Sequence, residues 1–369
     1  MHINLFIIPF IIVVGLLFSE TNSKRGRSSY IVICSIVLIL IASLRSPERM
    51  ASLYSLDTMK YEEMFERSFD MGWNEFVQIF YLRYFMGGED FDVGFTALNK
   101  IISFVTHEFW MFSVIADLLF FVPFGIIIYR YTTSVKQIMF VYVFYVALLQ
   151  IFFLAGARQM FSLGFDLMAL LAVVDRKFIR ALIFFVIGLT IHFSSFLFLI
   201  PLIMIWYNIK ANTLKIQHAL SFVIFPLVLF FPNQLIVFMG EVSGVERYAE
   251  FGRGAIQGGS WMFIFLIELM SLFCLIAIKK KNLIMNNAIR VFYVMTPLLT
   301  FFAPLIISNG SMIRISLYFH MFLCLLVPYA IDCSFDKKQR NTAYILAITA
   351  LSVLTLSGGG TQYYFFWQR

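Results

Sequence analysis

Residues 109–129 read FWMFSVIADLLFFVPFGIIIY, and this stretch decides the class of fold. It contains one charged residue, Asp117, and it matches the roughly 20 apolar residues that a helix needs to cross a bilayer core of about 30 Å. Its apolar side chains do not alternate with polar ones, as they would in a strand of an outer-membrane barrel. The stretch is therefore typical of a transmembrane helix.

The rest of the chain has the same character. Of its 369 residues, 61% are hydrophobic and 13% are charged, whereas a soluble globular chain has about 25% charged residues. This composition excludes a soluble or disordered protein and, despite a net charge of +7, a nucleic-acid-binding one. Apolar runs recur at 3–18, 30–44, 109–129, 138–154, 159–174, 178–191, 193–208, 216–231, 261–278, 290–307, 313–331 and 341–357. We therefore expect an all-α polytopic integral membrane protein, with about twelve transmembrane helices in a single membrane domain over residues 1–369.

Lysine and arginine concentrate in alternate loops, for example at 24–27, 279–281 and 337–340. The positive-inside rule places these loops in the cytoplasm and both termini outside. Two sizeable loops, 45–108 and 232–260, then lie outside, and the apolar stretch 95–105 in the first is short enough for an interfacial or re-entrant helix. The short cytoplasmic loops contain no phosphate-binding glycine motif, so we expect the chemistry at the outer face.

A few cations lie at the outer face, where this rule should deplete them. They are Arg45, Arg158, Arg314, His192 and, in the second outer loop, Arg247 and Arg253. The planar guanidinium group binds phosphate oxygens in pairs, so these arginines predict a diphosphate site; the alternative is that each snorkels to lipid headgroups. His192 is a candidate general base or phosphate partner.

The first outer loop adds polar candidates. If Asp57 begins a helix, Tyr61 lies one turn further on the same face; the alternative is a capping aspartate and an interfacial tyrosine. Glu89 is a second outer carboxylate. The sequence shows no metal-ligand spacing of histidine and cysteine, so no metal and no cofactor is expected.

Three acids fall within the apolar runs: Asp117, Asp166 and Glu268. Intramembrane carboxylates are functional candidates by default. They support an alternative function, a flippase for lipid-linked oligosaccharides or another secondary transporter. Against it, the sequence shows no internal repeat of the kind that transporters have.

Four blocks, taken in order, resemble the EpsG/Wzy family of bacterial polysaccharide polymerases, which make O-antigen, capsule and exopolysaccharide. They are Arg45 with Asp57 and Tyr61; Gly94-Phe95 to Asn99; Arg158-Gln159 followed by His192-Phe193-Ser194-Ser195; and Arg314 to Tyr318. The resemblance implies a multi-pass glycosyltransferase of the bacterial inner membrane. Such an enzyme passes a growing glycan from a polyprenyl diphosphate, such as undecaprenyl diphosphate, onto a lipid-linked repeat unit at the outer face. A third alternative is an O-antigen ligase.

The resemblance also implies roles for individual residues. Arg158 and Arg314 would clamp the diphosphate, His192 would lie at the reacting centre, and Asp57 with Tyr61 would orient sugar. We expect further substrate binding by Arg45, Glu89, Gln159, Arg247, Arg253 and Tyr318, although Glu89, Arg247 and Arg253 lie outside the four blocks and rest on chemistry alone. The expected partners are the lipid-linked oligosaccharide, membrane lipids, and a chain-length regulator and flippase of the same pathway.

Overall fold

The computed structural model describes residues 3–19, 23–46, 57–86, 92–150, 156–243, 246–254, 261–280, 287–357 and 363–368. Within these ranges the regular secondary structure is helical, apart from one isolated β-bridge between Arg45 and Phe365. This confirms the all-α class. The helices form two compact units, Met1–Leu199 with Ile345–Arg369 and Ile200–Tyr344, and each unit is described by itself.

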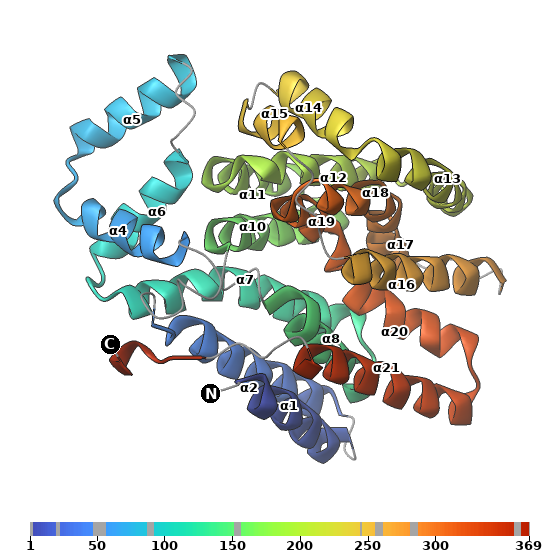
Figure 1. The fold of residues 1–369 in the computed structure, drawn as a ribbon. Coiled ribbons are helices and arrows are strands. Elements are labelled where there is room, and N and C mark those ends of the chain that lie inside the picture. The colour runs from blue at the N-terminus through green and yellow to red at the C-terminus, as the bar shows by residue number, and fades with distance from the viewer. Residues whose placement is uncertain are drawn as a thin grey trace. The chain divides into compact units, whose positions relative to one another are not determined.

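The first unit contains the predicted first outer loop and the helices around it (Figure 1). Its elements are α1 (Asn4–Ser19), α2 (Lys24–Ser43), α4 (Asp57–Asp70), α5 (Trp73–Phe85), α6 (Val93–Ser103), α7 (Phe109–Tyr131), α8 (Val135–Phe144), the π-helical turn η1 (Tyr145–Leu149), α10 (Ala157–Val174), α11 (Phe178–Ile191) and the 3-10 turn η2 (Phe193–Phe198). Near the C-terminus, η5 (Phe366–Gln368) also belongs to it.

The second unit holds the elements from residue 200 to 344. They are most of α12 (Leu199–Trp206), α13 (Ala211–Phe230), α14 (Pro232–Ser243), α15 (Glu246–Arg253), α16 (Trp261–Lys280), α17 (Asn287–Tyr293), α18 (Met295–Phe302), η3 (Ala303–Ile307), η4 (Gly310–Met312), α19 (Ile313–His320), α20 (Leu323–Ser334) and the first part of α21 (Lys337–Ser357). The described part of the predicted second outer loop is mainly a helical hairpin, α14 packed on α15. Gly240 allows this packing, because a Cβ there would lie 2.4 Å from the Ala249 nitrogen.

Six helical stretches in the described residues are long and apolar enough to cross a membrane. They are Lys24–Ser43, Phe109–Tyr131, Ala157–Val174, Asn212–Phe230, Trp261–Ile278 and Ile289–Ile307. A pair bent by 53°, Gly310–His320 with Leu323–Ser334, raises the number to seven if it is one span. The protein is thus a multi-pass membrane protein, but these helices do not support the predicted number of twelve.

The difference arises where apolar runs are broken into shorter helices. Asn4–Ser19, Val135–Leu149, Phe178–Ile191 and Phe193–Trp206 are apolar but have fewer residues than a straight span requires. The clearest break is at His192, whose extended backbone (φ −153°, ψ 116°) ends α11 before a 3-10 turn begins. Hydropathy alone does not reveal such backbone breaks.

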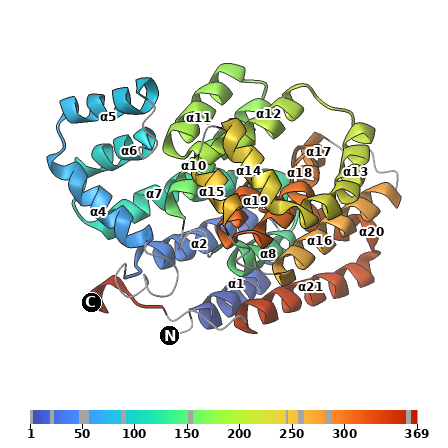
Figure 2. The same ribbon diagram turned by 45° about the horizontal axis from the view of Figure 1, so that its top comes forward.

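An aromatic core holds α4 and α6 against α7 and α10. Tyr61 and Phe65 of α4, Phe95 of α6, Phe112 of α7 and Phe161 of α10 belong to one buried cluster. Two independent views show α4, α5 and α6 as neighbouring helices (Figures 1 and 2). The predicted interfacial stretch 95–105 thus forms most of α6, a short helix with one face in this core.

A buried lysine fixes the register of α4 against α6. The Lys100 ammonium donates hydrogen bonds to the backbone oxygens of Ser68 (3.0 Å) and Phe69 (3.1 Å). These carbonyls lie in the last turn of α4, where the helix itself supplies no donors and where a cation suits the helix dipole. The Lys100 ammonium and two of the last carbonyls of α4 therefore satisfy each other inside the fold.

Replacing Gly94 with alanine should destabilise the first unit. A Cβ at Gly94 would lie 2.3 Å from the Thr190 hydroxyl oxygen and 2.6 Å from its backbone carbon, so α6 must move away from α11. We expect a cost of about 1–3 kcal/mol, as for other overpacked sites, measured as a lower midpoint in thermal unfolding of the purified protein. Gly72→Ala is the matched control, because a Cβ there meets nothing within 4 Å. Equal midpoints for both variants would contradict this packing.

Candidate functional site

Three charged or titratable side chains meet where three helices end. Arg158 is at the start of α10, His192 directly follows α11, and Asp92 directly precedes α6. Helices α10 and α11 are consecutive and packed together, so the N-terminal end of one lies beside the C-terminal end of the other. The close approach at Gly94 brings the start of α6 to the same place.

Asp92 is the centre of this cluster. Its Oδ2 atom accepts a hydrogen bond of 2.7 Å from Arg158 Nη1 and lies 3.8 Å from His192 Nδ1. The three side chains are 19–27% exposed, so they are partly shielded yet reachable. The distance to His192 is too long for a hydrogen bond. One carboxylate oxygen thus faces a guanidinium and an imidazole together.

The cluster retains polar atoms that could serve a ligand. Arg158 Nε and His192 Nδ1 are both buried and have no hydrogen-bond partner within the described part of the chain. Arg158 also lies at the positive end of the α10 dipole, where an anion is favoured and a cation is not. The helix dipole there already favours the Asp92 carboxylate that pairs with Arg158.

Two aromatic rings pack against the guanidinium group of Arg158. Its guanidinium carbon lies 5.5 Å from the centre of the Tyr61 ring and 5.9 Å from that of Phe95. Those two rings pack edge to face at 5.6 Å. Cation–π contacts of this kind hold the planar group in one orientation. Asp57, the first residue of α4, is close enough to interact electrostatically with Arg158. The structure thus brings Arg158, His192, Tyr61 and Asp57 into one region.

A buried pair of side chains anchors the turn that carries His192. The Ser195 hydroxyl lies 2.7 and 2.8 Å from the two carboxylate oxygens of Asp166 in α10. The Ser195 backbone N–H donates to the His192 carbonyl oxygen at 3.0 Å. Both Asp166 and Ser195 are fully buried. Asp166 therefore ties the turn after α11 to the helix that presents Arg158.

A second polar cluster surrounds Arg45, just after α2. Arg45 is buried, and its guanidinium donates to the Ala42 carbonyl oxygen and interacts with the Asp117 carboxylate. Ser43 donates a 2.8 Å hydrogen bond to Asp117. Burial lowers the pKa of Arg45, while Asp117 opposes that shift. Tyr61 lies near both Arg45 and Arg158, so the two clusters are neighbours.

The C-terminal segment covers this second cluster. The Tyr363 hydroxyl donates to the Ile41 carbonyl oxygen, and the Ser46 N–H donates to the Tyr364 carbonyl at 2.8 Å. The Phe366 N–H donates to the Leu44 carbonyl at 2.9 Å. The segment therefore holds the chain around Arg45 in an extended conformation.

The remaining predicted site residues are placed as follows. Gln159 is buried in α10. Arg314 is the second residue of α19, in the first half of the bent pair, and Tyr318 is buried in the same helix. Arg253 ends α15, and its guanidinium lies 4.0 Å from Glu241. These three residues belong to the second unit. The side chain of Arg247 and the whole of Glu89 lie outside the described residues.

Sequence reasoning missed Asp92 as a member of the site. It lies 66 residues from Arg158 in sequence, and the local sequence pattern does not indicate an ion pair between these two residues. Gly94, two residues after Asp92, belongs to one of the four blocks that resemble the family. A glycine that allows two helices to approach closely is the sequence signal that could have indicated a site residue nearby.

Together, these features define a multi-pass membrane protein with an arginine–aspartate–histidine cluster at the ends of its helices. The family model of the EpsG family matches residues 32–360, and the chain belongs to this family, the family of polysaccharide polymerases. A search of curated proteins found no match to the chain, and neither did a search of solved structures. Membership implies a polymerase-type function in polysaccharide biosynthesis.

Proposed function

We propose that the protein transfers a growing glycan from a polyprenyl diphosphate onto a lipid-linked oligosaccharide repeat unit, at the outer face of the bacterial inner membrane. The observation that carries the proposal is the meeting of Arg158, Asp92 and His192 at one end of α10 and α11. It supplies a cation for the diphosphate and a base for the acceptor in one partly shielded site. Family membership favours this function over a transporter.

The reaction requires one bond to form and one to break. An acceptor sugar hydroxyl oxygen bonds to the anomeric carbon of the donor, and the bond from that carbon to the diphosphate oxygen breaks. The bonding electron pair leaves with the diphosphate, whose growing charge Arg158 would stabilise. The hydroxyl proton passes to His192, and Asp92 would stabilise the resulting imidazolium. No nucleotide is needed, because the donor already carries its leaving group.

Neighbouring residues have supporting roles in this proposal. The rings of Tyr61 and Phe95 hold the guanidinium of Arg158 in one orientation. Asp57 and Tyr61 would orient the sugar. Arg314 is the second proposed diphosphate clamp. In the topology that the positive-inside rule predicts, with the basic loop at 24–27 in the cytoplasm, the Arg158 end of α10 faces the outer side. A flippase would supply the lipid-linked units, and a chain-length regulator would act on the product.

Deleting the gene should leave single repeat units where long chains were made. The wild-type chain should restore the long chains, and separation of surface glycans by size measures both results. Loss of a flippase would instead leave no units outside, and loss of a ligase would leave long chains on the polyprenyl carrier. Unchanged long chains in the deletion strain would overturn the proposal.

A further inference from the structure

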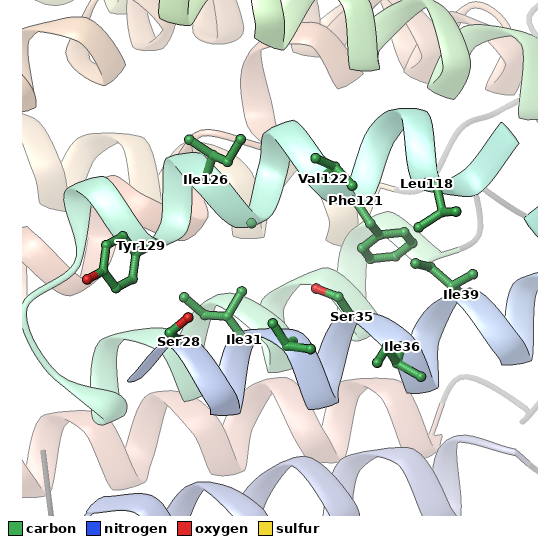
Figure 3. Close-up of a pocket in the computed structure, with 12 residues that line it drawn as sticks. Ser28, Ile31, Ser35, Ile36, Ile39, Leu118, Phe121, Val122, Ile126 and Tyr129 are labelled. Carbon is green, nitrogen blue, oxygen red and sulfur yellow. The ribbon is translucent and has the colours of Figure 1, made fainter. Parts of the chain in front are cut away.

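A groove runs along the first unit between α2 and α7 (Figure 3). Its volume is about 410 Å³, and it has no part in the site described above. Helix α2 contributes Ile31, Val32, Ile36 and Ile39 to its walls, and α7 contributes Leu118, Phe121, Val122 and Ile126. Gly125 in α7 keeps the groove open near its middle, because a Cβ there would lie 3.3 Å from the Ile31 side chain.

The lining suits a hydrocarbon chain. Val32, Ile36, Val122 and Ile126 are 50–52% exposed on helices that are long and apolar enough to cross a membrane, so they are open to lipid. Ser35, the polar residue near the middle of the groove, already shares a 2.8 Å hydrogen bond with the Tyr142 hydroxyl. Along the middle of the groove a ligand therefore gains by apolar contact, and the other polar lining residues, Ser28 and Tyr129, are at one end.

The length of the groove fits one leaflet of a bilayer. Along α2 it extends from Ser28 to Ile39, which at 1.5 Å per residue is about 16 Å. Half of a bilayer core is about 15 Å. A single acyl chain that starts at the headgroup level would fill the groove and end near the middle of the membrane. A long isoprenoid would extend well beyond it.

One end of the groove is basic. Figure 3 shows Ser28 and Tyr129 together at this end and Leu118 with Ile39 at the other. Lys24 and Arg25, both exposed, lie in the first turn of α2 just before Ser28. The Arg27 guanidinium lies 5.4 Å from the centre of the Tyr129 ring and donates to the Thr132 carbonyl oxygen. Clusters of basic residues beside a membrane helix attract anionic lipid headgroups.

From these features we infer that the groove binds an anionic phospholipid of the leaflet at the Lys24 end of α2. One acyl chain lies between α2 and α7, and the phosphate group lies against Lys24 and Arg25. The lipid would support the same helix pair that Ser43 and Asp117 join at its other end. The inference is independent of the proposed reaction, because this lipid is neither donor nor acceptor.

The test measures binding of phosphatidylglycerol and of phosphatidylcholine with the same chains to the purified full-length protein, by native mass spectrometry and by titration. We expect phosphatidylglycerol to be retained selectively. Val122→Trp and Ile36→Trp, which fill the groove from opposite walls, should each abolish its retention. Lys24→Gln with Arg25→Gln should weaken its binding roughly fivefold for each cation removed.

The matched controls are on α11. Ile183→Trp changes an apolar side chain that is 53% exposed and lines no described groove, and Arg180→Gln removes an exposed cation near the start of that helix. Both should bind like the wild type, and melting curves check that every variant folds. Equal retention of the two phospholipids, retention by both groove-filling variants, or retention of a polyprenyl phosphate in place of phosphatidylglycerol would each overturn the inference.

Discussion

Replacing Arg158 with alanine should reduce chain elongation roughly 100- to 1,000-fold, as removal of one strong donor to a developing negative charge does in other enzymes. The substitution removes the cation proposed to hold the diphosphate, and it leaves the Asp92 carboxylate without its 2.7 Å partner. Arg158→Lys should restore little of the elongation activity, because an ammonium group is a single point charge, whereas the planar guanidinium can donate two parallel hydrogen bonds to phosphate oxygens. The measurement is the size distribution of glycan made by the deletion strain carrying each variant.

The control for Arg158 is a second arginine–aspartate pair in the same unit. Arg130 also bonds an aspartate, Asp175, at 2.8 Å, but both side chains are more exposed, at 40% and 36%. Such a pair contributes about 0–1 kcal/mol, and Arg130→Ala should leave chain length unchanged. A transporter would give the reverse pattern: neutralising Asp117, Asp166 and Glu268 would abolish function while Arg158→Ala and Arg314→Ala had little effect.

Replacing His192 with glutamine should slow elongation by roughly 100- to 10,000-fold, the range that general acid–base catalysis supplies. Stability should change little, because His192 Nδ1 has no hydrogen-bond partner among the described residues. The expected result is therefore a folded membrane protein that binds lipid-linked units but does not join them. Elongation and thermal unfolding, measured on the same preparation, separate these two effects.

The matched histidine is His107. It lies on the first predicted outer loop, is exposed, and stacks on Phe69 with ring centres 4.4 Å apart. His107→Gln should leave elongation intact. Elongation by Asp92→Asn should fall between those of His192→Gln and His107→Gln, because the imidazole would remain but lose the carboxylate beside it. Full activity of His192→Gln would remove His192 from the reacting centre.

Part of the site was predictable from local sequence. Arg158 and His192 were recognisable because cations at the outer ends of apolar runs are unusual. The predicted pairing of Asp57 and Tyr61 on one helix is confirmed, as both lie in α4 one turn apart. Asp92 was not predictable in the same way, because a salt bridge between distant segments leaves no periodic pattern. Only the packing of α6 on α11 creates it.

The intramembrane acids show the same limit. Sequence alone gives Asp117 and Asp166 a possible part in transport, because an isolated carboxylate in a membrane helix is costly. In the structure each accepts a hydrogen bond from a serine, Ser43 or Ser195, that is distant in sequence or on another element. Such partners are supplied by tertiary structure. The all-α class of the fold, by contrast, follows directly from the amino-acid composition.

The bond from Tyr363 to Ile41 also sets an order of events during synthesis. The two residues are 322 positions apart, and ribosomes add about 5–20 residues per second, so roughly 15–65 s pass between their emergence. Until then, the segment that covers Arg45 has not been made. The first unit therefore completes its fold only after residue 363 has been synthesised.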